Sequence, residues 1–424
     1  MDLPQAIGDA VERRRDQLVA LVRELVSYRS ENPKLLPDLG QQELARLQEA
    51  ACQDCIAEHL RGLGMAIDRF EALPGRDDVV GILSGASDGP SLILNGHVDV
   101  VPAGDPALWP CDPWSGEVSG GKIWGRGACD MKGGLAAAIG ALSALGDVGV
   151  RLAGDVVVQA VVDEESGGPG TRVAVKRHRA DAAIVLEPTA GSIMPVEGGL
   201  EWLRVVVAGR SGHSALRYRS VHAGGRGVAV NAIEKAVKVL NGVQELERYW
   251  GNVKVHPLLP KGITTINPGL IEGGSPALST MADRCILGLS LKYLPGEQLD
   301  EVKREFEDHI RAVAQTDAWL REHPPTVEWG VSGVSFPASE ISTNHPLATV
   351  VANAYRSIRG EPTWAGFEAV SDLAWLAEAG VPALLLGPGD PAQAHTSAEY
   401  VEIDDLVATT SIVALAIAGW CGVT

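Results

Sequence analysis

Four short and almost wholly apolar segments, separated by stretches with helical periodicity, constrain the fold of this chain most. The segments read SLILNGHV (91–98), DVVVQAVV (155–162), AAIVLE (182–187) and VPALLLG (381–387). Strands that are apolar on both faces belong to sheets covered by helices on both sides, and such sheets are mostly parallel. Helices are predicted at 9–29, 41–62, 131–146 and 171–178. The sequence therefore predicts an α/β domain built on a mostly parallel sheet.

The middle of the chain has a different order of elements. It runs through a strand at 202–208, a helix at about 226–248, strands around 262–272 and 284–292, a helix at about 297–317 and a short strand at 326–329. This β-α-β-β-α-β order is typical of a ferredoxin-like α+β unit. At 424 residues the chain is long enough for two domains. We therefore predict one domain from 1–200 and 332–424, with a second domain, 201–331, inserted into it.

The chain is acidic, with 36 Lys and Arg against 54 Asp and Glu and a net charge of −18. Because an acidic surface repels phosphate backbones, nucleic acid is not expected as a partner. No basic run suits an anionic membrane surface, and we find no apolar run as long as a membrane span. The first residues, MDLPQAIGDAVERRRDQ, contain no apolar signal core. These features predict no membrane partner and a cytoplasmic location.

Cysteine is too scarce for a disulfide scaffold, since only six Cys occur in the chain. Cys52 and Cys55 form a CxxC inside the predicted helix 41–62, and no second CxxC completes a zinc site. We interpret both as ordinary helix cysteines.

Imidazole and carboxylate side chains stand where the predicted strands end. They are His97, Asp99, Glu164, Glu165, Glu187 and His395. Ligands of open α/β sheets bind at the carboxyl ends of the strands, so these side chains are expected to converge. His97 and Asp99 lie on the same side of their strand, because side chains alternate. A carboxylate there can fix the tautomer of a metal-binding imidazole.

Asp130 stands in GRGACDMKGG, where a Gly-rich loop enters the predicted helix 131–146. The loop lacks the GxGxxG spacing, and no Lys-Ser/Thr pair follows it, which weakens a nucleotide-binding interpretation. Each position also has an ordinary explanation when taken alone. His97 could make plain hydrogen bonds at a strand end, Asp130 could cap a helix, and Glu164 and Glu165 could lie in solvent.

Taken together, the residues point to metal. Consecutive acids at the end of a buried strand repel one another unless a cation compensates them. Mixed imidazole and carboxylate ligands favour Zn²⁺ or a similar divalent ion. Five candidate ligands exceed what one catalytic ion takes from protein. Two ions about 3.5–4 Å apart, bridged by a carboxylate, fit better.

With these motifs in hand, the chain resembles the M20 metallopeptidase family. Members include acetylornithine deacetylase, succinyl-diaminopimelate desuccinylase, aminoacylases and carboxypeptidase G. The resemblance is carried by NGHVDVVP, WGRGACDMKGG, DEESGG, LEPT and GPGDPAQAHTSAEYV, which stand in the family's order. It implies a zinc-exopeptidase-like catalytic domain and gives the inserted domain the role of a lid and dimerisation domain.

The resemblance also implies a role for each site residue. It assigns one metal to His97 and Glu187, the other to Glu165 and His395, and the bridge to Asp130, after which the peptide bond is often cis. Asp99 would orient His97. Glu164 would be the general base that activates the bridging water and then protonates the leaving nitrogen. His213, in AGRSGHSA, would stabilise the oxyanion, often in the partner subunit's active site.

The chain departs from the family pattern at positions that contact substrate. Ser279 stands in STMA, where an NVIP-like segment often carries Asn, and Lys292 replaces an Arg that often grips a substrate carboxylate. A second family Arg is missing from SDLAWLAEAG (371–380). The inserted RYRSVHAGGRG supplies alternative anchors at Arg217, Arg219 and Arg226, unless these form a solvated basic loop. Aromatic pocket residues could come from Trp364, Phe367 and Trp375, unless these pack in the core.

We therefore expect a metal-dependent hydrolase that cleaves a C–N bond, amide or N-acyl, of a small carboxylate-bearing metabolite. Alternatives are hydrolytic deamination of an aromatic amino acid or aminobenzoate and the activity of a dipeptidase or carboxypeptidase. A non-catalytic binding protein is disfavoured, since the base and all ligands are present. We expect two divalent ions as cofactors, Zn²⁺ first and Mn²⁺ or Co²⁺ otherwise. The expected partners are a small-molecule substrate and a second copy of the chain, in a homodimer through the lid.

Overall fold

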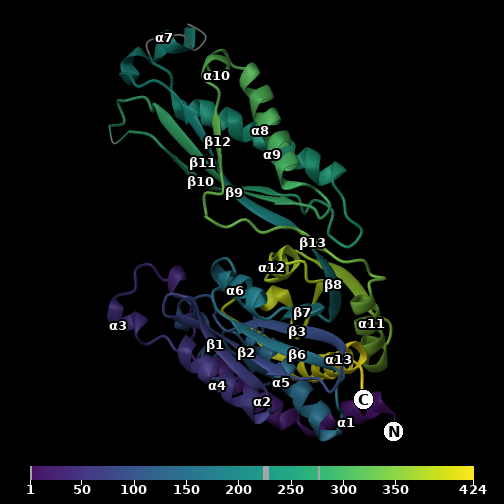
Figure 1. Cartoon of the computed structure of the whole chain (residues 1–424). Coiled ribbons are helices and arrows are strands. Elements are labelled where there is room, and N and C mark those ends of the chain that lie inside the picture. The colour runs from purple at the N-terminus through teal and green to yellow at the C-terminus, as the bar shows by residue number, and fades with distance from the viewer. Residues whose placement is uncertain (1, 223–228, 276) are drawn as a thin grey trace. The chain divides into compact units, whose positions relative to one another are not determined.

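The computed structural model describes residues 2–222, 229–275 and 277–424 (Figure 1). The chain divides into two compact units. Unit 1 comprises Met1–Val196, Ser339–Phe367 and Ser371–Thr424, and unit 2 comprises Glu197–Ala338 and Glu368–Val370.

A large sheet forms the centre of unit 1. Among the described residues its order is β1 (Ala66–Leu73), β2 (Arg76–Leu83), β6 (Gly154–Val161), β3 (Gly89–His97), β7 (Ala182–Pro188), β15 (Ala383–Gly387), β8 (Ser192–Glu197) and β13 (Ser339–Glu340), and β14 (Thr363–Phe367) pairs with β8. The central neighbours β6, β3, β7 and β15 run parallel, whereas β1, β2 and β8 join antiparallel. The predicted α/β class with a mostly parallel sheet is confirmed.

Helices cover both faces of this sheet (Figure 1). One face carries α1 (Leu3–Arg13), α2 (Arg15–Ser27), α4 (Glu49–Gly62), α5 (Lys132–Asp147), α11 (Pro346–Arg359) and α13 (Ile403–Cys421). The other face carries α6 (Pro169–Arg177) and α12 (Leu373–Glu378). Because both faces are covered, the central strands have no solvated side, which explains their continuous apolar runs.

The N-terminal elements differ in detail from the prediction. The helix expected at 9–29 is two helices, α1 and α2, separated at Arg14, whose φ of −96° and ψ of 5° are not helical. The helix expected at 41–62 is the short α3 (Gln41–Leu44) followed by α4. The hairpin of β1 and β2, not predicted from the sequence, turns at Pro74 and Gly75, where a φ of +73° suits glycine.

One helix corrects the prediction that no apolar run reaches the length of a membrane span. By length and composition α13 could cross a membrane, and 67% of its most apolar stretch is buried inside the structure. It packs against α1, α5, α11 and the centre of the sheet at β3. Its contacts with other core elements account for its apolar composition.

Unit 2 has the predicted ferredoxin-like order. Its main elements are β9 (Gly199–Ala208), α8 (Ala232–Val253), β10 (Ile266–Gly273), β11 (Arg284–Tyr293), α9 (Leu299–Gln315) and β12 (Thr326–Trp329). The strands form an antiparallel sheet in the order β10-β11-β9-β12. Alternate residues of β9, among them Leu203, Val205 and Val207, are buried against α8 and α9 in a separate apolar core. The short α7 (Arg217–His222) and α10 (Ala318–Glu322) complete the described part of the unit.

A third, small sheet in unit 1 joins distant parts of the chain. It pairs β16 (Tyr400–Glu402) with β5 (Lys122–Trp124) and β5 with β4 (Glu117–Ser119). This pairing brings the segment after β15 beside the loop that leads from β5 to α5.

Candidate metal centre

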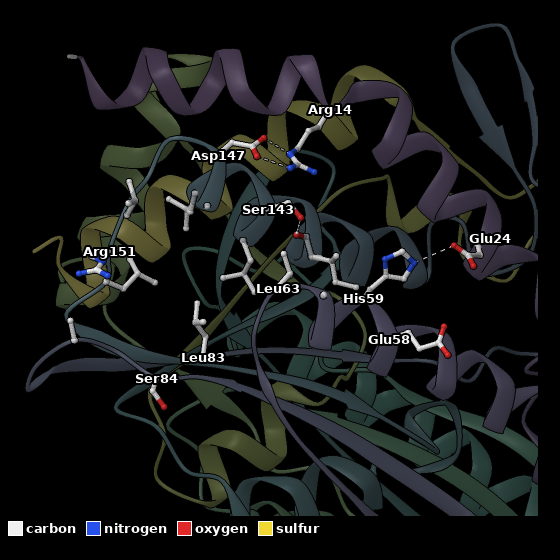
Figure 2. Close-up of a pocket in the computed structure, with 18 residues that line it drawn as sticks. Arg14, Glu24, Glu58, His59, Leu63, Leu83, Ser84, Ser143, Asp147 and Arg151 are labelled. Atoms are coloured by element: carbon white, nitrogen blue, oxygen red, sulfur yellow. Dashed lines mark hydrogen bonds and ion pairs between the residues drawn. The ribbon is translucent and has the colours of Figure 1, made fainter.

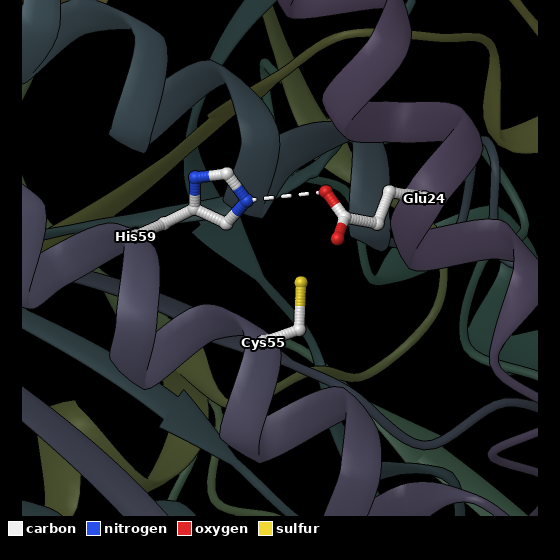
Figure 3. A group of neighbouring side chains, drawn as sticks. All are labelled: Glu24, Cys55 and His59. Carbon is white, nitrogen blue, oxygen red and sulfur yellow. Dashed lines mark hydrogen bonds and ion pairs between the residues drawn. The ribbon is translucent and has the colours of Figure 1, made fainter.

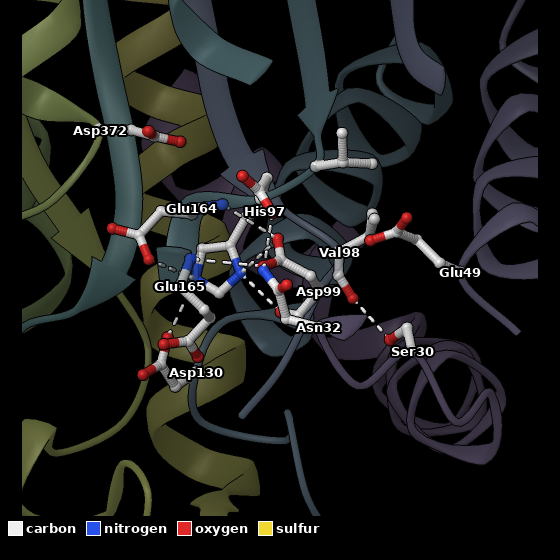
Figure 4. Close-up of polar contacts among 12 residues, drawn as sticks. Ser30, Asn32, Glu49, His97, Val98, Asp99, Asp130, Glu164, Glu165 and Asp372 are labelled. Carbon is white, nitrogen blue, oxygen red and sulfur yellow. Dashed lines mark hydrogen bonds and ion pairs between the residues drawn. The ribbon is translucent and has the colours of Figure 1, made fainter. Parts of the chain in front are cut away.

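The carboxyl ends of the central strands bring imidazole and carboxylate groups together (Figure 4). His97 is the last residue of β3, and Glu187 lies near the end of β7. Glu164 and Glu165 begin a single turn of 3₁₀ helix directly after β6. Figure 4 shows His97, Asp130 and Glu165 turned toward one another. Parallel neighbours end at the same edge of a sheet, so the strand order itself creates this cluster.

Asp130 lies between two imidazoles. It ends the loop after β5, and the peptide bond that follows it, Asp130–Met131, is cis, as the resemblance led us to expect. Its Oδ1 is 3.1 Å from Nε2 of His97, and its Oδ2 is 3.3 Å from Nε2 of His395. One carboxylate thus offers one oxygen to each histidine, which is the arrangement of a ligand that bridges two ions.

The remaining donors divide between these two histidines. Nε2 of His97 is 3.6 Å from Oε1 of Glu187 and 3.9 Å from Oε2 of Glu164. Nε2 of His395 is 3.1 Å from Oε2 of Glu165. His395 has a φ of 63°, a conformation that is uncommon for a residue with a side chain and recurs at functional sites. The structure therefore brings together the five residues predicted to bind metal, in the predicted pairs.

The charges of the cluster fit two divalent cations. Burial raises the pKa of Glu164 and Glu187 well above the usual range, and it also raises the pKa of Glu165. Oε1 of Glu165 is buried and has no hydrogen-bond partner among the described residues. Hydrogen bonds to Asp130 and Glu165 raise the pKa of His395 to about 10. Several buried acids with two histidines, and an acceptor oxygen left without a donor, are the donor set that Zn²⁺ and related ions require.

His97 is oriented by the main chain of Asp99. Its Nδ1–H donates to the carbonyl oxygen of Asp99 at 2.8 Å, which leaves the Nε2 lone pair free for a metal. The carboxylate of Asp99, which the sequence analysis expected in this role, lies 3.8 Å from Nδ1. It instead accepts the backbone N–H groups of Glu164 and Glu165, at 3.2 and 3.3 Å. Asp99 therefore fixes the turn that carries both glutamates.

Asn32 is a further positioning residue that the sequence analysis missed. Its side-chain amide donates to Asp99 at 2.7 Å and to the buried Asp163 at 3.0 Å (Figure 4). It comes from the segment after α2, far from the motifs in the chain, and SENP carries no recognisable signal.

Glu399 supports the loop of Asp130 and was also missed. It accepts the backbone N–H groups of Gly127, Cys129 and Asp130 at 2.9, 3.0 and 3.1 Å and pairs with Arg126 at 2.5 Å. Burial raises its pKa to about 7. A signal existed here, since Glu399 stands in the same HTSAEYV segment as His395.

The remaining predicted residues belong to unit 2, and the described ones contact other residues of that unit. His213 is exposed, and its Nδ1 accepts the N–H of Ala215 at 3.0 Å. Lys292 donates to the carbonyl of Glu368, and Arg217 pairs with Glu234. The carbonyl of Ser279 accepts the N–H of Ser214 at 2.7 Å. Arg226 lies outside the described residues.

The aromatic residues considered for a substrate pocket pack inside unit 1. Phe367 and Trp375 are buried, and Trp364 packs against the core of the unit. The guanidinium of Arg172 lies 4.5 Å from the centre of the Trp375 ring.

The chain is similar to known proteins along most of its length. Residues 93–419 match the model of peptidase family M20/M25/M40. The chain is 36% identical, over 97% of its length and 96% of the relative's, to N-formyl-4-amino-5-aminomethyl-2-methylpyrimidine deformylase of Bacillus subtilis (strain 168). It is 37% identical, with the same coverage, to the deformylase of that name from Halalkalibacterium halodurans. Among solved structures, a dinuclear metal-binding M20 peptidase of Bacillus subtilis, 15% identical, has the same fold, with a TM-score of 0.68 over 96% of this chain and 99% of that one.

Proposed function

Because the chain belongs to peptidase family M20/M25/M40 and is a metal-dependent hydrolase of C–N bonds, we propose that it removes the formyl group from an N-formylated aminomethylpyrimidine. The observation that carries the proposal is the similarity to two deformylases along 97% of the chain. The cluster around Asp130 supports it, since its donors lie within reach of one another.

The divalent ions would be held by His97 and Glu187 on one side and by Glu165 and His395 on the other, with Asp130 shared. When bound, such ions polarise a carbonyl as Lewis acids and make a water molecule more acidic. We propose Zn²⁺ as the physiological ion, which the mixed imidazole and carboxylate donors support, and the metal content of the protein as isolated tests this.

Glu164 would move the proton. It accepts a proton from the attacking water as the C–O bond forms, and it delivers that proton to the nitrogen as the C–N bond breaks. The first products are formic acid and the free aminomethylpyrimidine; the proton that formic acid releases passes to the amine, so formate and the ammonium form result and atoms and charge balance without any further reactant. The carboxyl of Glu164 lies beside the proposed metal ligands, with Oε2 3.9 Å from Nε2 of His97.

The substrate in this proposal carries no carboxylate, unlike the metabolite expected from the sequence. The positions at which this chain departs from the family pattern support a substrate without a carboxylate. No Arg stands in SDLAWLAEAG, Lys292 is engaged by the carbonyl of Glu368, and Arg217 is paired with Glu234. Because no cationic side chain at these positions is free to bind a carboxylate, the chain is better suited to a neutral or weakly basic ring than to an acid.

Product analysis tests the proposal. The purified enzyme with Zn²⁺ is given the N-formylaminomethylpyrimidine, N-acetylated amino acids, an aminobenzoate and dipeptides in parallel. Release of formate from the first substrate, with a kcat/KM at least tenfold above the others, is the expected result. Ammonia from the aminobenzoate or amino acids from the dipeptides would instead support the deaminase or dipeptidase alternatives.

We also propose a homodimer through unit 2. The edge strand β10 supports it, because Leu270 and Ile271 on this strand are 46% and 56% exposed and an unpaired edge can add a strand. Light scattering of the wild type and of Ile271→Lys tests it, with a monomer expected only for the variant.

We propose a cytoplasmic location as well. All six cysteines are free, which suits a reducing compartment. Fractionation of cells that express the protein tests this.

A further inference from the structure

A second group of metal-binding side chains lies on helices α2 and α4 of unit 1. Cys55 and His59 are four residues apart on α4, so they share one face of the helix. Glu24 faces them from α2, and Figure 3 shows the three side chains converging. The N–H at Nε2 of His59 donates to Oε2 of Glu24 at 3.2 Å. One donor atom from each of the three residues lies within 4.8 Å of the others.

The group combines a buried sulfur with two accessible donors. Cys55 is 6% exposed, whereas the side chains of His59 and Glu24 are 37% and 48% exposed. His59 and Glu24 also line a cavity of about 1110 Å³, together with residues such as Leu63 and Ser143 (Figure 2). Cys55 does not itself line the cavity, but an ion held by His59 and Glu24 at the cavity wall lies within reach of its sulfur, and water can complete the coordination.

We propose that Glu24, Cys55 and His59 bind one thiophilic divalent cation, of which Zn²⁺ is the natural candidate, apart from the catalytic pair. Zn²⁺ binds Cys sulfur at about 2.3 Å and His nitrogen at about 2.0 Å, which places donors of one ion roughly 3.5 Å apart. The three donor atoms need to move only slightly closer together. The side chains of Glu24 and His59 can make this movement because they are partly exposed. Sulfur with imidazole selects Zn²⁺ over Mg²⁺ or Ca²⁺, which prefer oxygen ligands alone.

The thiol of Cys55 also interacts with the Glu24 carboxylate and with the Tyr28 hydroxyl. Burial, followed by the charge of Glu24, raises the pKa of the Cys55 thiol to about 12. A cation at this point has to displace the thiol proton, as Zn²⁺ does at protein thiols, and it would then neutralise both the thiolate and the carboxylate.

The ion would clamp α2 to α4. Beyond Glu24, the carbonyl oxygen of Tyr28, at the end of α2, accepts a hydrogen bond from Nζ of Lys132 at 2.8 Å. This bond connects α2 to the segment that follows the catalytic loop. Lys132 begins α5, two residues after Asp130. The role of the site is therefore support of the catalytic domain, and it adds no group to the reaction.

Titration of the metal-free protein with Co²⁺ tests the proposal, because a thiolate ligand gives Co²⁺ a near-ultraviolet charge-transfer band. The catalytic donors are imidazoles and carboxylates and give no such band. The wild type is expected to develop the band, and Cys55→Ser to lose it while it keeps formate release and two bound ions. Cys111→Ser, which alters a cysteine outside the group, is the matched control and should keep the band.

His59→Asn gives a second readout at a position whose side chain is partly exposed. Its Co²⁺ affinity, measured by titration of the thiolate band, should fall by about tenfold or more, because the imidazole no longer supports the ion. A wild type that shows no thiolate band at saturating Co²⁺, or a band of equal intensity in Cys55→Ser, would overturn the proposal.

Discussion

Glu164 and Glu165 are neighbours in the sequence, yet their carboxylates have different surroundings. Oε2 of Glu165 lies 3.1 Å from His395, in the position of a ligand. Oε2 of Glu164 comes no closer than 3.9 Å to His97, and burial raises its pKa well above the usual range. Two adjacent acids can thus serve different purposes, one holding a cation and the other a proton.

Glu164→Gln should abolish turnover without emptying the metal centre. Glutamine fills the same space but cannot accept the proton of water, so kcat should fall by about 10²–10⁴-fold. Metal content, measured on the same sample, should stay at the wild-type level. Glu164→Asp, which keeps a carboxylate, should retain more activity than the glutamine variant. Unchanged turnover in Glu164→Gln would refute the assignment of the base.

Asp78 makes stability depend on pH. It is fully buried on β2; its Oδ1 accepts the N–H of Val162 at 3.0 Å, and its Oδ2 has no hydrogen-bond partner in the part of the chain that the structure describes. Burial raises its pKa to about 8, above the ordinary value of 3.8, so the folded chain binds this proton more tightly than the unfolded chain. Its contribution to stability is complete below about pH 4 and is lost as the pH rises through about 8.

Asp78→Asn should remove this dependence. The amide keeps an oxygen for Val162 and does not titrate, so the variant should lose less stability than the wild type between pH 6 and pH 9. The difference in slope is at most about 1.4 kcal/mol per pH unit. Denaturant unfolding at both pH values measures it. Asp77→Asn, one residue earlier and half-exposed, is the control. Parallel pH profiles for wild type and Asp78→Asn would contradict the assignment.

At the scale of elements, the loop from β5 to α5 depends on a side chain from another part of the chain. Glu399 accepts the N–H groups of Gly127, Cys129 and Asp130 in this loop and thereby holds the backbone of Asp130. The loop also has backbone hydrogen bonds, among them Arg126 N–H to Pro113 and Ala128 N–H to Gly125, but Glu399 is the side chain that accepts the N–H of Asp130 itself.

Glu399→Gln should therefore weaken both stability and metal binding. The neutral amide loses the charge that Arg126 and the N–H groups require, which costs about 1–3 kcal/mol of unfolding free energy. Zn²⁺ affinity should fall by about 10–100-fold, because the bridging carboxylate is less well held. Urea unfolding and Zn²⁺ titration measure the two effects. Glu402→Gln on the exposed edge of β16 serves as control, and equal behaviour of the two variants would refute this role.

Elements with strong patterns could be predicted from the sequence, and those that depend on distant contacts could not. The strands that end at His97 and Glu187 are apolar throughout, and the parallel-sheet rule then places their ends together. Asn32 and Glu399 act through hydrogen bonds between loops, which no local pattern encodes. The break at Arg14 was also missed, since the apolar face continues across it from α1 to α2.

At the scale of the whole molecule, the class of each unit was predictable because it follows from the order of helices and strands. The confirmed class did not predict the substrate. The proposed substrate without a carboxylate draws on the contacts of cationic side chains such as Lys292 and Arg217, and only the folded chain reveals these contacts.

Removal of metal should abolish activity and lower stability together. Without cations, Asp130, Glu165 and Glu187 face one another across the centre, and the coulombic influence of Asp130 raises the pKa of both glutamates beyond the effect of burial. Chelator-treated protein should unfold at a lower temperature, and Zn²⁺ at 100 times its Kd should restore about 2.7 kcal/mol of stability. Calorimetry and formate release, each repeated with Mn²⁺ and Co²⁺, measure the two effects. Full activity in protein with no detectable metal would contradict the mechanism.

The position of His395 in the chain has a consequence for biosynthesis. His97, Asp130, Glu165 and Glu187 all leave the ribosome before any of unit 2, whereas His395 emerges only after it. In the proposed assignment, a nascent chain can hold one ion with these four donors. The site of the second ion stays incomplete until the segment after β15, which carries His395, folds back. The order of translation thus keeps the growing polypeptide free of hydrolytic activity until both units have been made.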